Sequence, residues 1–234
     1  MSARRRAGAL ALVVLAGCSY CDGREELEAA RSGDLDALQA LGELGDPRIP
    51  SSASLTDVKI GEALAVVAPF LESTDPLVRL QALEAARHLA TRQRDLYRSR
   101  FPTLIDQMLA DPEVEIRWRA AWALGRLERT CPALRAALAD PHPRVAERAA
   151  WALGQARDEE AVDPLIDALE ADPTVARQAA RSLGRITGLR HGPEPAAWSG
   201  WARQWRARRA IDDAQAPPAP PGDEVPPPGG EGDD

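Results

Sequence analysis

The sequence DPEVEIRWRAAWALG, residues 111–125, is repeated 29 residues later as DPHPRVAERAAWALG, residues 140–154. Both stretches begin with Asp-Pro, carry an aliphatic residue five positions after the Asp, and end in Ala-Ala-Trp-Ala-Leu-Gly. A match of this length does not arise by chance, and an internal period in this range is typical of stacked supersecondary units. The function therefore has to be inferred from a repeat array.

Related stretches lie on both sides, DPLVRLQALEAA at residues 75–86 and DPTVARQAARSLG at residues 172–184, each with two residues fewer after the proline. Each copy predicts a helix, because Asp can cap its start, Pro suits its first turn, and apolar residues recur every three and four positions. The equivalent aliphatic positions are Val78, Ile116, Val145 and Val175, and the glycines near the expected helix ends are Gly125, Gly154 and Gly184.

A shorter amphipathic helix is expected before each copy, so that each unit is a helical hairpin. These first helices are expected at residues 62–72, 103–110, 133–139 and 161–171. Apolar residues between Arg24 and Asp46, interrupted by Ser-Gly-Asp, predict two more short helices that cap the array. The sequence thus predicts an all-α domain at residues 24–212, with clear repeats at 62–187.

The pattern resembles the HEAT-repeat family, and in detail it is similar to the short bacterial repeats related to those of phycobilin lyases. The resemblance covers residues 62–187 and, more weakly, 38–46. It implies a right-handed α-solenoid with helical caps at both ends, in which the second helix of each hairpin lines a concave surface. HEAT arrays serve as scaffolds, adaptors, regulators and occasionally enzymes, so this fold does not by itself decide the function.

Residues 1–17 read as a targeting segment, with three arginines followed by an apolar stretch too short to cross a bilayer as a helix. Leu-Ala-Gly-Cys at residues 15–18 resembles the lipobox of bacterial lipoproteins, which implies that Cys18 becomes an acylated N-terminus and that residues 18–23 link the anchor to the fold. The folded part is then expected in the cell envelope outside the cytoplasm, and Ser19 implies the outer membrane if the source is Gram-negative. A plain secretory signal that happens to contain cysteine is the alternative.

The charge and the remaining cysteines add two expectations. The chain carries a net charge of −7, and loss of the three signal arginines takes the mature form to −10, which argues against a generic nucleic-acid binder. Cys21 and Cys131 could pair in an oxidising compartment, whereas the simpler interpretation is a buried Cys131 and a free Cys21.

Two insertions interrupt the repeats. Residues 48–58, rich in Pro and Ser, form either a binding element or an unconstrained loop. Residues 91–102 carry Tyr97 within a cluster of arginines, and they either hold an acidic partner or a phospholipid headgroup or simply continue a solvated helix. These arginines are Arg92, Arg94, Arg98 and Arg100.

Equivalent positions of the second helices should form rows of Trp and Arg along the expected concave surface. Trp and Arg dominate protein-binding hot spots, and an arginine-lined groove suits a carboxylate-rich or phosphorylated ligand. Trp122 and Trp151 are equally well explained by packing on a neighbouring repeat, whereas Trp118 has no counterpart and is the sharper candidate. The candidate partner-binding residues are Trp118, Trp122, Trp151, Arg119, Arg148, Arg177 and Arg181.

We find no catalytic constellation in the sequence, and His88, His142 and His191 have no partner at metal-ligand spacing. We therefore expect no metal, no cofactor, no small-molecule substrate and no enzymatic activity. The favoured hypothesis is a lipid-anchored scaffold for an unidentified protein partner, to which an acidic surface would be complementary. The alternative is a HEAT-like enzyme or enzyme subunit, similar to bilin lyases or DNA glycosylases.

The C-terminal part divides into two segments. Residues 188–210 contain Trp198, Trp201 and Trp205 at helical spacing, which predicts one aromatic face that caps the last repeat or, alternatively, an aromatic ligand cage. Residues 213–234 are rich in Pro, Gly and acidic residues without apolar periodicity, and they are expected to be disordered.

Overall fold

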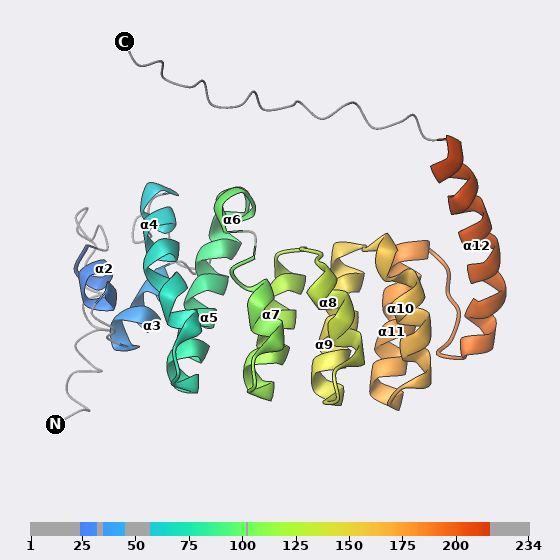
Figure 1. Ribbon diagram of the computed structural model, residues 1–234, viewed down its shortest axis with the longest axis horizontal. Coiled ribbons are helices and arrows are strands. Elements are labelled where there is room, and N and C mark those ends of the chain that lie inside the picture. Colours follow the sequence, from blue (N-terminus) through green and yellow to red (C-terminus); the bar gives the residue numbers. More distant parts are fainter. Residues whose placement is uncertain (1–23, 32–34, 45–56, 102, 216–234) are drawn as a thin grey trace, which may run out of the picture. The chain divides into compact units, whose positions relative to one another are not determined.

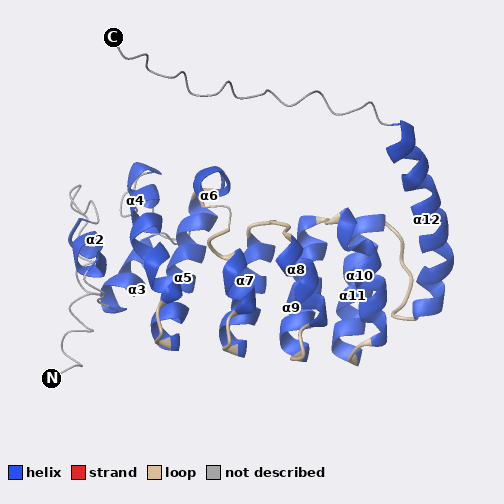
Figure 2. Ribbon diagram, viewed as in Figure 1, coloured by secondary structure: helices blue, strands red, loops and turns tan. Residues whose placement is uncertain are grey.

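The computed structural model describes residues 24–31, 35–44, 57–101 and 103–215. Every regular element in these ranges is a helix, so the all-α prediction is confirmed (Figure 2). Two compact units divide after Pro195. The targeting segment, Cys18, Cys21, residues 48–56 of the first insertion and the tail after residue 215 lie outside the described residues.

The first unit is a stack of helical hairpins, as expected. Its second helices are α5 (Pro76–Arg92), α7 (Val114–Arg126), α9 (Pro143–Ala156) and α11 (Pro173–Thr187). Each contacts the next in chain order, and together they form a row (Figure 1). Its other elements are α2 (Arg24–Arg31), α3 (Leu35–Leu44), α4 (Asp57–Val67), η2 (Ala68–Glu72), α6 (Arg94–Arg100), η3 (Asp106–Ala110), α8 (Pro132–Ala136), η4 (Ala137–Ala139), η5 (Glu159–Ala161), α10 (Val162–Asp167) and η6 (Ala168–Glu170). The fold is therefore an α-solenoid.

The first helices are shorter and more broken than the sequence suggested. The one expected at residues 103–110 is a 3-10 helix at Asp106–Ala110 alone, and the others end in or are interrupted by 3-10 turns. By contrast, α4 starts earlier than expected, so that Asp57 and Val58 belong to a helix and not to the first insertion.

The repeat glycines allow neighbouring second helices to approach closely. A Cβ at Gly125 would lie 2.9 Å from the Ala152 Cα and even closer to the Trp151 ring, so the absence of a side chain there makes room for the indole. Gly154 makes room for Ser182 in the same way. Gly125 and Gly154 lie in the last turns of their helices, as expected. The residues with a left-handed backbone conformation after α7 and α9 are not these glycines but Glu128 and Arg157, each with φ 52°.

The aspartates have two different roles at the helix starts. Asp75 and Asp172 cap α5 and α11 as predicted, each accepting a backbone N–H at 2.8 Å. In the two longer copies the prediction was wrong, because the capping residues are Glu113 and His142. In these copies the aspartate lies two residues before the capping residue, and its side chain accepts the backbone N–H of that residue.

These displaced aspartates join consecutive repeats. Asp111 accepts both arms of Arg79 from the preceding second helix, with N···O distances of 2.7 and 3.0 Å, and Asp140 accepts Arg117 in the same way at 2.7 and 3.1 Å. Such two-pronged pairs are stronger and more directional than single hydrogen bonds. The series ends at α9, where Ala146 occupies the position of Arg117.

Two further ion pairs occupy equivalent positions in consecutive repeats, but with the acidic and the basic residue exchanged. Arg129 contacts Asp106 at 2.8 Å, and Arg135 contacts Asp158 at 2.8 Å. Residues 106 and 135 occupy equivalent positions 29 apart, as do 129 and 158. The same contact, between a first element and the segment that follows the second helix of its repeat, is therefore made with acid and base swapped.

The second insertion folds as a separate helix, so the expectation of a longer solvated helix was wrong. Helix α5 ends at Arg92 and α6 follows it. Tyr97 is buried, and its hydroxyl accepts the backbone N–H of Ile105 at 3.2 Å. Arg94 donates to the Arg126 carbonyl at 3.1 Å and Arg98 to the Leu127 carbonyl at 3.4 Å, which places positive charge at the C-terminus of α7.

Cys131 is buried, as the simpler interpretation predicted, and its Sγ accepts the Leu134 N–H at 3.4 Å at the start of α8. Burial raises the pKa of this thiol. Whether Cys131 pairs with Cys21 stays untested. Among the helices in the described ranges, none is both long and apolar enough to span a membrane.

The second unit contains α12 (Pro195–Gln215), so residues 213–215 of the predicted tail are helical. Its three tryptophans share one face as predicted: the Trp198 and Trp201 rings lie edge to face at 5.8 Å, and the Trp201 and Trp205 rings stack at 5.8 Å. Trp198 is fully buried. That this face caps the last repeat stays a prediction.

Candidate partner-binding face

We call the surface of α5, α7, α9 and α11 that is formed by the seven nominated Trp and Arg residues and by the positions equivalent to them the second-helix face. At its N-terminal end Trp118 lies at the centre of a cluster. The indole N–H donates to Glu115 at 2.8 Å, while the guanidinium carbons of Arg144 and Arg119 lie 3.9 and 5.1 Å from the centroid of the ring. Because Arg144 belongs to α9, these cation–π contacts join two repeats.

Glutamates neutralise the arginines of this cluster. Arg119 contacts Glu115 at 2.8 Å and Glu84 of α5 at 2.8 Å, and Glu84 also accepts Arg87 at 2.9 Å. The Trp118 hydrogen bond, followed by Arg119, lowers the pKa of Glu115. Burial acts to raise the pKa of Glu84, but its two arginines outweigh it and lower that pKa. Trp118 and Arg119, which the sequence nominated for partner contacts, are thus held by partners within the chain.

Trp122 and Trp151 both pack on the preceding repeat. The Trp151 ring lies over Gly125, whereas the position equivalent to Gly125 in α5 is Arg87, whose guanidinium stacks 4.6 Å from the Trp122 centroid. The packing interpretation is therefore right about what these rings contact. Each remains half-buried, which leaves part of its surface exposed.

At the C-terminal end of the face, Trp151 and three arginines of α11 line a pocket of about 830 Å³ with the loop at residues 188–193. We call it the cationic pocket. Arg181 and Arg185 are exposed, and the loop contributes Arg190 and His191. Arg177 donates to the Pro173 carbonyl at 3.2 Å. Within the described part of the chain no carboxylate lines this pocket, and none lies within ion-pair distance of the arginines of α11. The pKa of the exposed Asp172 carboxyl is lowered by hydrogen bonds from Thr174 and, at longer range, by the charge of Arg177.

The structure therefore separates the seven nominated residues. It brings Trp151, Arg177 and Arg181 into one pocket and places Trp118, Trp122 and Arg119 in contacts within the chain. Arg148 is half-buried, and its buried Nε has no hydrogen-bond partner among the described residues.

The pocket also contains residues that were not nominated from the sequence. Arg185 stands in an expected row of equivalent positions and follows Arg181 by one helical turn, so it shares the same face and could have been nominated with it. Arg190 and His191 follow no periodic pattern in the sequence, since they lie on the loop after Gly188, whose φ of 78° ends α11. The neutralising role of Glu84 depends on its contact with a different repeat, which no local pattern indicates.

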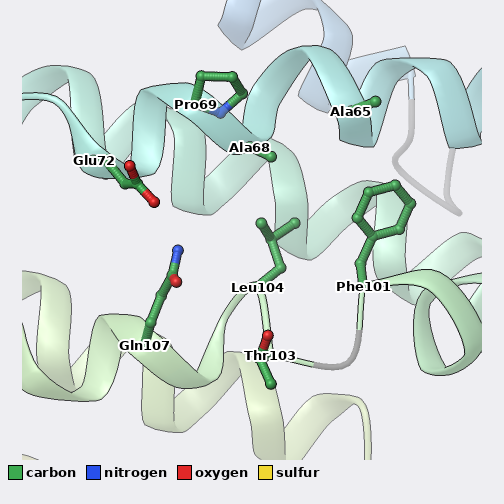
Figure 3. A pocket seen from close by; sticks show the side chains of 8 residues that line it. All are labelled: Ala65, Ala68, Pro69, Glu72, Phe101, Thr103, Leu104 and Gln107. Atoms are coloured by element: carbon green, nitrogen blue, oxygen red, sulfur yellow. The ribbon is translucent and has the colours of Figure 1, made fainter.

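A second pocket, of about 440 Å³, lies between first elements and contains none of the nominated residues. Figure 3 shows the side chains of Glu72 and Gln107 directed toward each other, with Leu104 and Phe101 beside them. Its only charged lining residue is an acid. The described residues contain no group of three His, Cys, Asp or Glu placed to hold a metal ion.

These features define a class of protein: an α-solenoid of helical hairpins whose second helices display a Trp- and Arg-rich face. Residues 101–188 match the family model described as HEAT repeats. The match includes α7, α9 and α11, and with them most of the face.

Solved structures of engineered proteins are similar to the chain. Two have TM-scores of 0.46, one with 19% identity over 77% of this chain and 97% of its own, the other with 22% identity over 78% and 48%. A third has a TM-score of 0.44 and 19% identity over 77% and 99%. Among curated proteins no sequence match was found.

Proposed function

We propose that this protein is a lipid-anchored scaffold of the bacterial cell envelope that binds a protein partner through the second-helix face. HEAT repeats commonly act as protein-interaction scaffolds, since a stack of repeats offers an extended surface. One observation carries the proposal: Trp151, Arg177 and Arg181 line one pocket that no carboxylate of the described residues lines.

Elsewhere in the same array the buried arginines, such as Arg79 and Arg117, are used to join repeats through aspartates. The exposed arginines of α11 join nothing comparable. Arg and Trp grouped on one surface are the residue types that contribute most to protein interfaces.

The anchor part of the proposal rests on the lipobox-like residues 15–18. Acylation of Cys18 would hold the array at a membrane surface, in the outer membrane if the source is Gram-negative, with the folded part in the periplasm or outside the cell. A partner protein is then expected in the same compartment. The proposal includes neither nucleic acid nor a small-molecule substrate.

The test starts with full-length protein expressed in a bacterial host beside Cys18→Ala. Intact mass and membrane fractionation should show acylated, membrane-bound wild type and an unmodified variant that does not sediment with membranes. Soluble, unmodified wild type would sink the anchor part.

The partner part is tested with a photo-crosslinking amino acid at Arg181, with Glu170 as the matched control. Glu170 is also exposed and lies in the same repeat, but on η6 and outside the face. The Arg181 site should capture a defined envelope protein that the Glu170 site does not. Equal capture from both positions would argue against a specific face.

No specific observation favours the enzymatic alternative. It is tested separately by titrating the full-length chain with duplex DNA and with a bilin. Saturable binding of either, weakened by Arg177→Gln, would replace the scaffold proposal.

A further inference from the structure

We propose that the cationic pocket binds an extended acidic segment of a protein, with carboxylates at alternate positions. This inference rests on the proposed function in assuming a protein partner, and it names the chemistry of that partner and its place on the face. The binding groups are the guanidiniums of Arg177, Arg181 and Arg185, and Arg190 of the loop at residues 188–193 and Trp151 also line the pocket.

The spacing of the arginines carries the first step. Arg177, Arg181 and Arg185 follow one another every four residues on α11, which places successive Cα atoms about 6 Å apart along the helix axis at a rise of about 1.5 Å per residue. In an extended chain, side chains on the same face are two residues apart, or roughly 6.6 Å. Three alternate carboxylates therefore match the three guanidiniums.

The chemistry of the groups carries the second step. A guanidinium donates two parallel hydrogen bonds to a carboxylate, which an ammonium does not do. Gln178 lies between the arginines and donates through Nε2 to the Ser182 hydroxyl at 3.3 Å, so its amide oxygen is left to accept a backbone N–H. A segment with a free edge of backbone groups supplies such a donor, as in recognition of extended peptides.

The surroundings favour a short protein segment over a long polyanion. The chain as a whole has a net charge of −7, and the arginines near Trp118 are already paired with Glu84 and Glu115. At physiological salt, attraction reaches only about 8 Å, so the pocket acts on groups that enter it. A long polyanion would extend onto the acidic remainder of the surface, whereas a segment of a few residues would not.

The experiment uses the full-length chain in non-ionic detergent and a fluorescein-labelled peptide, Asp-Val-Glu-Val-Asp-Val-Glu, whose valines favour an extended conformation. Anisotropy should show saturable binding that weakens as salt is raised. The matched amide peptide, Asn-Val-Gln-Val-Asn-Val-Gln, should not bind. Inorganic polyphosphate, and phosphatidylglycerol in mixed micelles with the same detergent, are titrated as competitors and should displace the peptide only weakly.

Two variants locate the binding. Arg181→Gln and Arg185→Gln should each weaken binding about two- to fivefold, as expected for an exposed ion pair. Arg126→Gln is the matched control, because Arg126 is exposed and occupies in α7 the position that Arg185 occupies in α11. It should leave the affinity unchanged. Thermal melts followed by circular dichroism verify that all three variants are folded.

Four results would overturn the inference: unchanged affinity in both α11 variants, an equal loss in Arg126→Gln, binding of the amide peptide, or tighter binding of polyphosphate or of the phosphatidylglycerol micelles. Each can occur while crosslinking from Arg181 still captures an envelope protein, in which case the scaffold stands and the pocket chemistry is wrong. Conversely, peptide binding with an unmodified Cys18 would keep the pocket and remove the anchor.

Discussion

The two ends of the second-helix face both carry Trp and Arg, but the electrostatic results are opposite. Around Trp118, Arg119 is held between Glu84 and Glu115, and the surface is neutralised. Around Trp151, the pocket that Arg181 and its neighbours on α11 line contains no carboxylate of the described residues. A repeat array can therefore keep its fold while changing, from one repeat to the next, which charges are left for a partner.

The difference comes from two positions. Glu84 in α5 is replaced by Trp in α7 and α9 and by Arg181 in α11, and Glu115 in α7 is replaced by Arg144 in α9 and Thr174 in α11. The acids are thus confined to the N-terminal repeats. The ion pairs that join consecutive repeats follow the same division. Arg79 and Arg117 each bind an aspartate of the next repeat, whereas the equivalent residue in α9 is Ala146, which cannot form an ion pair with the exposed Asp172.

The largest expected effect comes from breaking the ion pair between Arg79 and Asp111, which joins two repeats at the N-terminal end of the face. Arg79→Gln leaves Asp111 buried without its partner, and the free energy of unfolding should fall by about 3–5 kcal/mol. Urea unfolding of the full-length chain measures the loss. Arg94→Gln is the control: its pair with Glu128, at 3.5 Å, is exposed on both sides and should contribute no more than about 1 kcal/mol. Equal losses would show that the buried pair has no special role.

The second prediction concerns the ion pair between Arg129 and Asp106, whose equivalent in the next repeat has acid and base exchanged. Arg129→Asp places two acids together and should lower the free energy of unfolding by about 2–4 kcal/mol, because Asp106 loses its partner in a mostly buried site. Adding Asp106→Arg recreates the arrangement of Arg135 and Asp158 and should recover most of that loss. A double-mutant cycle by urea unfolding measures the coupling. Additive losses would mean that the exchanged pairs are not equivalent.

A smaller loss is expected where the two ends of the face meet. Gly125→Ala forces a methyl group against the Trp151 ring, and overpacking of this kind costs about 1–3 kcal/mol. Gly200→Ala is the matched control, because its Cβ meets nothing within 4 Å on α12 and helix propensity should raise stability by about 0.5–1 kcal/mol. If Gly125→Ala were neutral, the close contact would not constrain the helix pair.

The smallest effect concerns the carboxylates that neutralise the N-terminal end. Because the pKa of Glu115 is lowered in the folded state, its contribution is complete above the ordinary carboxyl value and is lost as pH falls through the lower folded value. Glu115→Gln should therefore lower stability at pH 7 by less than about 1 kcal/mol, since the side chain is partly exposed, and by less still at pH 3. Urea midpoints at the two pH values measure this difference, and a pH-independent change would contradict it.

The local patterns of the sequence determined the helices and their order. Asp-Pro starts, three- and four-residue apolar spacing and a 29-residue period depend on neighbours within one or two turns, so they predicted α7, α9 and α11 without knowledge of what surrounds them. The spacing of Trp198, Trp201 and Trp205 likewise predicted one face of α12. For the site, the same rows nominated Trp151, Arg177 and Arg181, and the structure brings these three together.

Only the tertiary structure decided which arginines are neutralised. Arg119 and Arg181 were nominated from the sequence on the same grounds. The carboxylate that makes their environments differ is Glu84, which binds Arg119 but lies 35 residues from it and in another repeat. The separate helix α6 was also beyond local patterns, because the buried Tyr97 fixes it through contacts with residues outside its own turns. Periodicity specifies the position of a side chain on its own helix, whereas its charge environment depends on which side chains the neighbouring helices bring beside it.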